Sequence, residues 1–284
     1  MEDMATVPTL RFHDDHAIPQ LGYGVFKVDP AVAADVTGQA LRAGYRHIDT
    51  AAAYGNEEGV GQAIRESGIP RDELFVTTKL WDDAHAYDDA LAAADASLER
   101  LGLEYVDLYL THWAVPAQGL YVDAWKALIE LQRRGKVRSI GVSNHPVPQL
   151  EEIIEATGVV PVIHQIELHP YFQQRELRAV HERHGILTEA WGPLGQGKSD
   201  LLENPVLADI AAARSATPAQ VAIAWQLAHG HVVIPKSVTP SRIEENLGAK
   251  DLALTSEEVA AIDALDRPDG RGGMDPAQRP LPGA

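Results

Sequence analysis

The chain has 284 residues, of which 45% are hydrophobic and 23% charged, and it contains no cysteine. One βα barrel of about 250 residues fits this length better than two small domains, so we expect a single domain over residues 1–284. The net charge of −17 disfavours nucleic acid and anionic membranes as partners, and the lack of cysteine excludes disulfides and thiolate catalysis.

In chain order, residues 1–6 are too few and too acidic for a signal peptide. Residues 9–26 then predict a β-hairpin that caps one barrel mouth, because two β-rich pieces flank the polar turn at 13–16. No apolar run reaches the roughly 18 residues of a membrane span. We therefore expect a cytoplasmic protein, and we expect it to be a monomer.

Beyond the hairpin, short β-branched runs alternate with amphipathic helical stretches about every thirty residues, a pattern typical of βα units. The helical stretches 88–102 and 121–135 each end at a glycine suited to a left-handed C-cap, and capping boxes at Thr217 and Thr255 predict two later helix starts. The predicted strands are 46–50, 75–79, 106–112, 139–144, 162–167, 187–191 and 232–237, with a weaker eighth at 250–254. Eight such units predict an α/β fold of the (β/α)8 TIM-barrel type, followed by an irregular tail over 266–284 that covers a site.

Four polar side chains lie where the first three predicted strands end: Asp49, Tyr54, Lys79 and His112. Reactive groups of βα barrels lie at these carboxyl ends, so we expect the four to meet. Tyrosine has an ordinary pKa of about 10, and a neighbouring Lys79 ammonium held by Asp49 would lower it. A neutral His112 would orient a carbonyl oxygen. The four residues predict a site that accepts hydride at carbon and supplies a proton at oxygen.

The segment 236–242 predicts a phosphate site, because two cations and several hydroxyls lie at an expected helix start. Arg242, Glu245 and Asn246 share one face of that helix.

Other polar motifs carry no further site. His181 and His184 stand one turn apart, His164 and His169 lie on opposite faces of a strand, and no third ligand follows, so we predict no metal. The glycines at 59 and 61 lie inside a helix without a third glycine, which indicates helix packing rather than a dinucleotide site.

Seven stretches between residues 44 and 246 resemble the aldo-keto reductase family: GYRHIDTAAAYGNEEGVG, FVTTKLW, DLYLTHW, GVSN, HQIELHPY, AWGPLGQG and IPKSVTPSRIEEN. The family consists of NADP-dependent (β/α)8-barrel enzymes, and this chain is most similar to the bacterial 2,5-diketo-D-gluconate reductase branch. The resemblance implies NADPH-dependent reduction of small aldehydes and ketones to alcohols, with Tyr54 as the general acid.

The resemblance also implies which residues bind the cofactor and the substrate. The nicotinamide carboxamide would be bound by Ser143, Asn144 and Gln165, and the nicotinamide ring would stack on Trp191. The pyrophosphate would be bound by the loop residues Gly192, Leu194, Gln196 and Gly197. The adenosine 2′-phosphate and the adenine would be bound by Lys236, Ser237, Val238, Arg242, Glu245 and Asn246. The 2′-phosphate contacts imply NADPH over NADH. The apolar substrate pocket would consist of Phe26, Trp81 and Trp113.

Two other functions stay open at this point. Lys79 at a strand end could form a Schiff base with a carbonyl substrate, which would make the protein an aldolase-like lyase. Alternatively, the barrel could be a non-catalytic NADPH-sensing subunit. The sequence of the tail predicts no particular physiological substrate.

Overall fold

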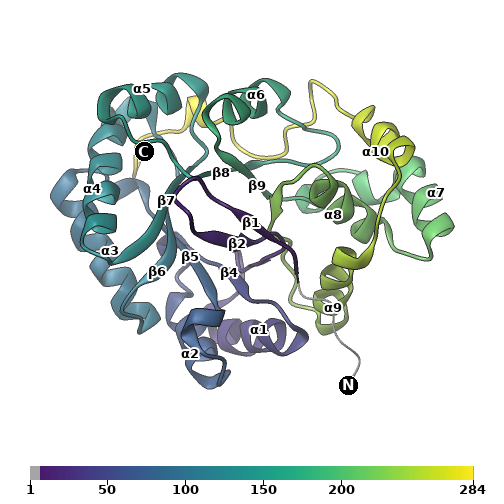
Figure 1. Ribbon diagram of the computed structural model, residues 1–284, viewed down its shortest axis with the longest axis horizontal. Coiled ribbons are helices and arrows are strands. Elements are labelled where there is room, and N and C mark those ends of the chain that lie inside the picture. Colours follow the sequence, from purple (N-terminus) through teal and green to yellow (C-terminus); the bar gives the residue numbers. More distant parts are fainter. Residues whose placement is uncertain (1–6, 284) are drawn as a thin grey trace.

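The computed structural model describes residues 7–283, so the opening stretch considered as a signal peptide lies outside the described residues. Eight parallel strands form one sheet whose order follows the chain, and helices surround it (Figure 1). The strands are β3 (Tyr23–Gly24), β4 (His47–Asp49), β5 (Phe75–Leu80), β6 (Val106–Thr111), β7 (Val137–Ser143), β8 (Ile163–Glu167), β9 (Leu187–Trp191) and β10 (Val232–Val233). The helices are α1 (Pro30–Ala43), α2 (Glu57–Glu66), α3 (Tyr87–Leu101), α4 (Tyr121–Arg133), α5 (Val147–Thr157), α6 (Arg175–His184), α7 (Pro205–Arg214), α8 (Pro218–Ala228), α9 (Pro240–Gly248) and α10 (Ser256–Asp263).

Backbone hydrogen bonds between the segment at β3 and β10 close the sheet into a barrel. The Gly22 N–H donates to the Val233 carbonyl at 2.8 Å, and the Val233 N–H donates to the Gln20 carbonyl at 2.9 Å. Leu21 and Val233 form a parallel bridge at the same seam. The predicted (β/α)8 barrel is therefore confirmed, and among residues 7–283 no helix is long and apolar enough to cross a bilayer.

Two predictions about strands are wrong. The stretch 250–254 is not the eighth strand, since it forms the end of the 3₁₀ turn Ala249–Asp251 and then irregular chain. Its leucines at 252 and 254 alternate like those of a strand, but they pack against the helical cluster around α7 and α8. The missing barrel strand is β3, which the sequence assigned to the hairpin because a two-residue strand carries almost no pattern.

The hairpin itself is shorter than predicted and consists of β1 (Thr9–Arg11) and β2 (Ala17–Pro19). Its Phe12 and Ile18 pack against Phe75 and Ile163, the first residues of β5 and β8. Figure 1 shows the hairpin crossing the barrel. It closes the mouth at the amino ends of the strands, so the opposite mouth, where the strands carry polar side chains, is left for a site.

Gly61 supports the helix-packing interpretation of the two glycines in α2. A methyl group on Gly61 would lie 2.0 Å from the Leu101 carbonyl oxygen at the end of α3. The two helices approach so closely that only a residue without a side chain fits between them.

Candidate active site

The carboxyl ends of the barrel strands open into a cavity of about 690 Å³, a volume suited to a small molecule or cofactor. The predicted site residues that line it are Phe26, Asp49, Tyr54, Trp81, His112, Trp113, Asn144, Gln165, Trp191, Gly192, Leu194, Gln196, Gly197, Lys236 and Arg242. The predicted residues outside its wall are Lys79, Ser143, Ser237, Val238, Glu245 and Asn246. Most of the expected site therefore surrounds one cavity, and Lys79 lies directly behind that wall.

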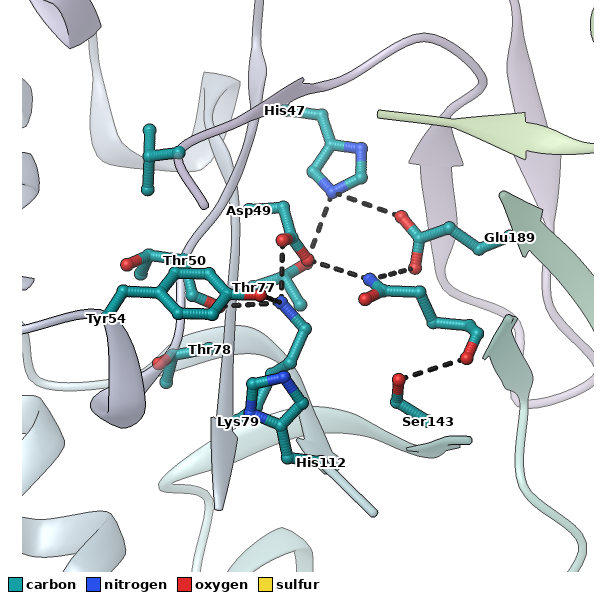
Figure 2. Close-up of polar contacts among 12 residues, drawn as sticks. His47, Asp49, Thr50, Tyr54, Thr77, Thr78, Lys79, His112, Ser143 and Glu189 are labelled. Atoms are coloured by element: carbon teal, nitrogen blue, oxygen red, sulfur yellow. Dashed lines mark hydrogen bonds and ion pairs between the residues drawn. The ribbon is translucent and has the colours of Figure 1, made fainter. Parts of the chain in front are cut away.

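Lys79 joins the residues of the predicted acid. Its Nζ donates to Asp49 Oδ1 at 2.6 Å, to the Thr50 carbonyl at 2.8 Å and to the Tyr54 hydroxyl at 3.4 Å (Figure 2). Lys79 is fully buried and Asp49 is 2% exposed. An ammonium buried in this way with a carboxylate partner holds the phenol in a fixed place.

The register between β4 and β5 explains why Asp49 and Lys79 lie next to each other. Asp49 of β4 pairs with Thr77 of β5, and Lys79 follows two residues later on the same face of the sheet. Tyr54 ends the short 3₁₀ turn Ala52–Tyr54 after β4, and Gly55 then reverses the chain with a φ of 66°. The turn places the tyrosine ring over the end of the neighbouring strand.

The pKa of Tyr54 departs from the sequence prediction. Burial raises it to about 12, although the Lys79 ammonium acts in the opposite, predicted direction. For Lys79, burial lowers the pKa, but Asp49 and Tyr54 together outweigh burial and raise it. The expectation that Lys79 would bring the tyrosine pKa below its ordinary value is therefore wrong for the protein alone, because desolvation of the phenolate is the larger effect.

His112 lies beside the tyrosine, with ring centroids 5.5 Å apart and the rings edge to face at 74°. Burial, with the charges of Lys79 and Arg279, holds the pKa of His112 well below its ordinary value. The imidazole is therefore neutral near pH 7, and its Nδ1 has no partner among the described residues. A neutral ring with unused hydrogen-bonding capacity fits the predicted role of orienting an oxygen.

The residues expected around the nicotinamide form a connected network. Gln165 Nε2 donates to Asp49 Oδ2 at 2.8 Å and to Glu189 Oε2 at 2.9 Å, which uses both amide hydrogens. The oxygen of the Gln165 side-chain amide is therefore the atom that can bind a ligand. Asn144 donates to the His112 carbonyl at 3.0 Å and accepts from Trp191 Nε1 at 2.9 Å, so the tryptophan ring has a fixed position. Ser143 Oγ donates to the backbone carbonyl of Gln165 at 3.0 Å and does not line the cavity.

The predicted phosphate-binding elements lie at the other end of the cavity. The loop 192–197 contains three glycines and Gln196 with positive φ, so its backbone turns sharply along the cavity wall. Lys236 and Arg242 are exposed, line the cavity and form no ion pair with any carboxylate among residues 7–283. Glu245 faces away, since its carboxylate accepts from the Thr217 hydroxyl at 2.7 Å at the start of α8.

The tail contributes residues that the sequence did not predict. Arg279 donates through Nε to Asp82 Oδ2 at 2.7 Å, and its guanidinium lies 5.1 Å from the Trp81 ring centroid and 4.7 Å from that of Trp113. Gly272 and Gly273 donate backbone N–H groups to Glu167 at 2.7–3.0 Å. These hydrogen bonds, to Asp82 and to Glu167, hold the tail over the carboxyl end of the barrel, as expected of a segment that covers a site.

The sequence offered no signal for these contacts. The proline- and glycine-rich tail has no periodicity from which the direction of Arg279 could be inferred. Glu189 is also absent from the predicted site, although it shares the period-two face of Trp191, because a single glutamate inside a predicted strand does not by itself indicate a site. No group of three potential metal ligands occurs among residues 7–283.

Similar proteins of known sequence and structure identify the family of this chain. The sequence model of the Aldo/keto reductase family matches residues 20–267. An aldo-keto reductase of Mycobacterium sp. (strain KMS) is 48% identical over 270 residues, covering 95% of this chain and 96% of the relative. The methylglyoxal reductase DkgA of Escherichia coli (strain K12) is 49% identical over 275 residues, covering 97% and 99%.

The fold comparison gives the same family. The crystal structure of a Gox0644 mutant in complex with NADPH superposes with a TM-score of 0.93 at 48% identity, covering 97% of this chain and all of the other. The family model matches most of the chain. The relatives are 48% and 49% identical to it over nearly their whole length, and proteins this similar share a fold and a family. The chain belongs to the aldo/keto reductase family.

Proposed function

We propose that this protein reduces aldehydes and ketones to alcohols with NADPH, and that Tyr54 donates the proton. The observation that carries this proposal is the contact of Lys79 Nζ with the Tyr54 hydroxyl at 3.4 Å, behind a cavity that Tyr54 and His112 both line. When bound, NADPH supplies hydride to the carbonyl carbon. The protein's own residues then have to orient the oxygen and protonate it.

The roles of the four residues follow from their chemistry. The Tyr54 hydroxyl is protonated near pH 7, since burial raises its pKa to about 12, and it is the proton donor. Lys79 stabilises the phenolate that forms when the proton leaves, and Asp49 keeps Lys79 charged and in place. Neutral His112 donates a hydrogen bond to the carbonyl oxygen as negative charge develops there.

The cofactor assignment is supported by the described residues and by relatives. Trp191 and the free oxygen of Gln165 suit the nicotinamide ring and its carboxamide, and the cavity-lining cations Lys236 and Arg242 suit a phosphate. A mutant of Gox0644 was crystallised in complex with NADPH, and DkgA is named a methylglyoxal reductase. Methylglyoxal is therefore a suitable first substrate for an assay that follows NADPH absorbance. Cytoplasmic location and a monomeric state stay predictions from the sequence.

Exchange of both cations should separate the two nicotinamide cofactors. Lys236→Ala with Arg242→Ala is expected to weaken NADPH binding about a hundredfold or more, because two charge-assisted phosphate contacts are lost. NADH, which has no 2′-phosphate, should bind within about threefold of its wild-type affinity, since the other contacts remain. Titration of tryptophan fluorescence measures both dissociation constants.

The loss of two positive charges from the surface needs its own control, and the exposed pair Arg133 and Arg134 at the end of α4 provides it. Replacing both with alanine removes the same number of charges far from the cavity and should change neither dissociation constant. Equal weakening of NADPH and NADH in the Lys236 and Arg242 variant would contradict the phosphate assignment.

The tail contact with the substrate pocket leads to a further prediction. Arg279→Met removes the pair with Asp82 and loosens the tail over Trp81 and Trp113, so KM for the carbonyl substrate should rise about tenfold, with kcat changed less. Arg271→Met is the matched control, because that tail arginine lies 4.6 Å from the Phe172 ring and outside the wall of this cavity. An unchanged KM in Arg279→Met would contradict a role for the tail in substrate binding.

The two rival functions are less well supported. A Schiff base needs a neutral amine, but the neighbours of Lys79 raise its pKa and its Nζ already donates to three oxygens. A purely NADPH-sensing role would not need the Tyr54 hydroxyl and the neutral His112 ring on the wall of one cavity. Borohydride trapping of a covalent adduct would favour the lyase, and absence of steady-state turnover would favour the sensor.

A further inference from the structure

Glu189 is a second carboxyl group in the barrel interior, and the proposed reaction does not use it. It projects from β9, is linked to Asp49 through the side-chain amide of Gln165, and is fully buried. Its only hydrogen-bond donor among the described residues is Gln165 Nε2, at 2.9 Å from Oε2, while Oε1 has no partner there. Figure 2 shows Glu189 beside Asp49 and His47.

The titratable groups that interact with Glu189 are His47 and Asp49 on β4, Lys79 on β5 and, through its charge, Tyr54. His47 Nε2 lies 3.8 Å from Glu189 Oε1, which is too long for a hydrogen bond, and it contacts Thr77 Oγ1 at 3.2 Å. Burial lowers the pKa of His47 to about 3, so the ring is neutral. The ring also cannot shift freely, since it lies against the backbone of Gly22, where a methyl group would be 2.4 Å from Nδ1.

Charge balance then decides the state of Glu189. One amide, that of Gln165, donates to both Asp49 and Glu189, so the two carboxyl groups are close, and Lys79 is the only ammonium within residues 7–283 that pairs with either of them. With Asp49 ionised and Glu189 neutral, the buried cluster has no net charge. A second ionised carboxylate, accepting a single amide hydrogen bond, would leave a buried negative charge without a counterion.

We propose that Glu189 is a positioning residue for carbonyl reduction: as a neutral carboxylic acid it fixes the Gln165 amide toward the cofactor site and keeps the cluster uncharged, and its ionisation weakens the acid Tyr54. The proposal rests on the proposed function, in which the tyrosine gives up its proton to the substrate oxygen. A negative Glu189 would oppose formation of the phenolate, because both charges would lie in the same low-dielectric interior.

The proposal predicts where the rate of reduction should fall with pH. Burial, and next to it the charge of Asp49, raise the pKa of Glu189 to about 8, against the hydrogen bond from Gln165 and the charge of Lys79. The wild-type rate should therefore decline near this pH, well below the pKa of Tyr54. Glu189→Gln stays neutral at every pH and can still accept the Gln165 amide, so its kcat at neutral pH should be within about twofold of the wild type.

The decisive measurement is the pH profile of kcat with NADPH and methylglyoxal. In Glu189→Gln the alkaline decline should move upward by at least about one pH unit. Glu167→Gln is the matched control: it replaces another buried glutamate, on β8, which is bound by tail amides rather than by Gln165. That variant should leave the alkaline decline where it is in the wild type. A Glu189→Gln profile that declines at the wild-type pH would overturn the proposal.

A second measurement uses the wild-type protein, so it depends neither on catalytic activity nor on whether a variant folds. Infrared difference spectra of the wild-type protein with isotope-labelled glutamate should show the carbonyl band of a protonated carboxylic acid at neutral pH, lost as the pH rises through about 8. Absence of that band would overturn the neutral state of Glu189, whatever the activity. Failure of the tyrosine assignment would instead be visible as persistent turnover in Tyr54→Phe, with the infrared titration unaffected.

Discussion

Tyr54→Phe is expected to lower kcat/KM for carbonyl reduction about a thousandfold or more, because it removes the proposed proton donor and hydrogen-bond donor to the substrate oxygen. The aromatic ring, which packs 5.1 Å from Phe26 and edge to face with His112, stays in place. NADPH should bind with unchanged affinity, as measured by quenching of tryptophan fluorescence. The expected pattern is therefore a lost chemical step with intact cofactor binding.

The matched control for this substitution is Tyr87→Phe, which removes the hydroxyl of an exposed tyrosine at the start of α3. It should leave both kcat and the NADPH dissociation constant unchanged. Retention of more than about a tenth of wild-type kcat/KM in Tyr54→Phe would mean that another group supplies the proton. In that case His112 would be the next residue to test, since it lines the same cavity.

The sequence is sufficient for the barrel and for the meeting of Asp49 with Lys79, because both depend on strand periodicity. In each strand, the alternation of side chains determines which residues face the barrel interior. A polar residue at the carboxyl end of the strand then lies at the carboxyl mouth of the barrel. The helix starts at Thr217 and Thr255 are equally local, and both have the predicted capping boxes. Features whose whole pattern lies within about ten residues can therefore be predicted from the chain.

The errors and omissions concern features that no local pattern encodes. β3 has two residues, and its segment pairs with β10 across the closed barrel, a contact between residues more than two hundred positions apart. Arg279 reaches Asp82 from an irregular tail, and its direction depends on the whole path of that tail. The pKa of Tyr54 differs from the prediction because burial, which outweighs the nearby Lys79, is a property of the folded interior.

Lys79→Met is expected to abolish most turnover and also to destabilise the fold. Removing the ammonium leaves Asp49 buried without a counterion, which should lower the free energy of unfolding by about 3–5 kcal/mol. Because the pKa of Lys79 is raised in the folded state, its stabilising contribution is complete below the ordinary value of 10.5 and is lost only as the pH rises through the folded value. Urea unfolding at neutral pH therefore measures the whole effect. Lys126→Met, at an exposed lysine paired with Asp123 at 3.6 Å, should cost less than about 1 kcal/mol.

The double variant Asp49→Asn with Lys79→Met separates the two roles of the ammonium. A buried pair replaced by neutral side chains leaves no uncompensated charge, so the double variant should recover most of the lost unfolding free energy. Turnover should remain about a hundredfold or more below the wild type, because the ammonium that stabilises the Tyr54 phenolate in the proposed mechanism is absent. Recovery of turnover together with stability would mean that Lys79 only maintains the fold, and the acid would then have to work without a neighbouring cation.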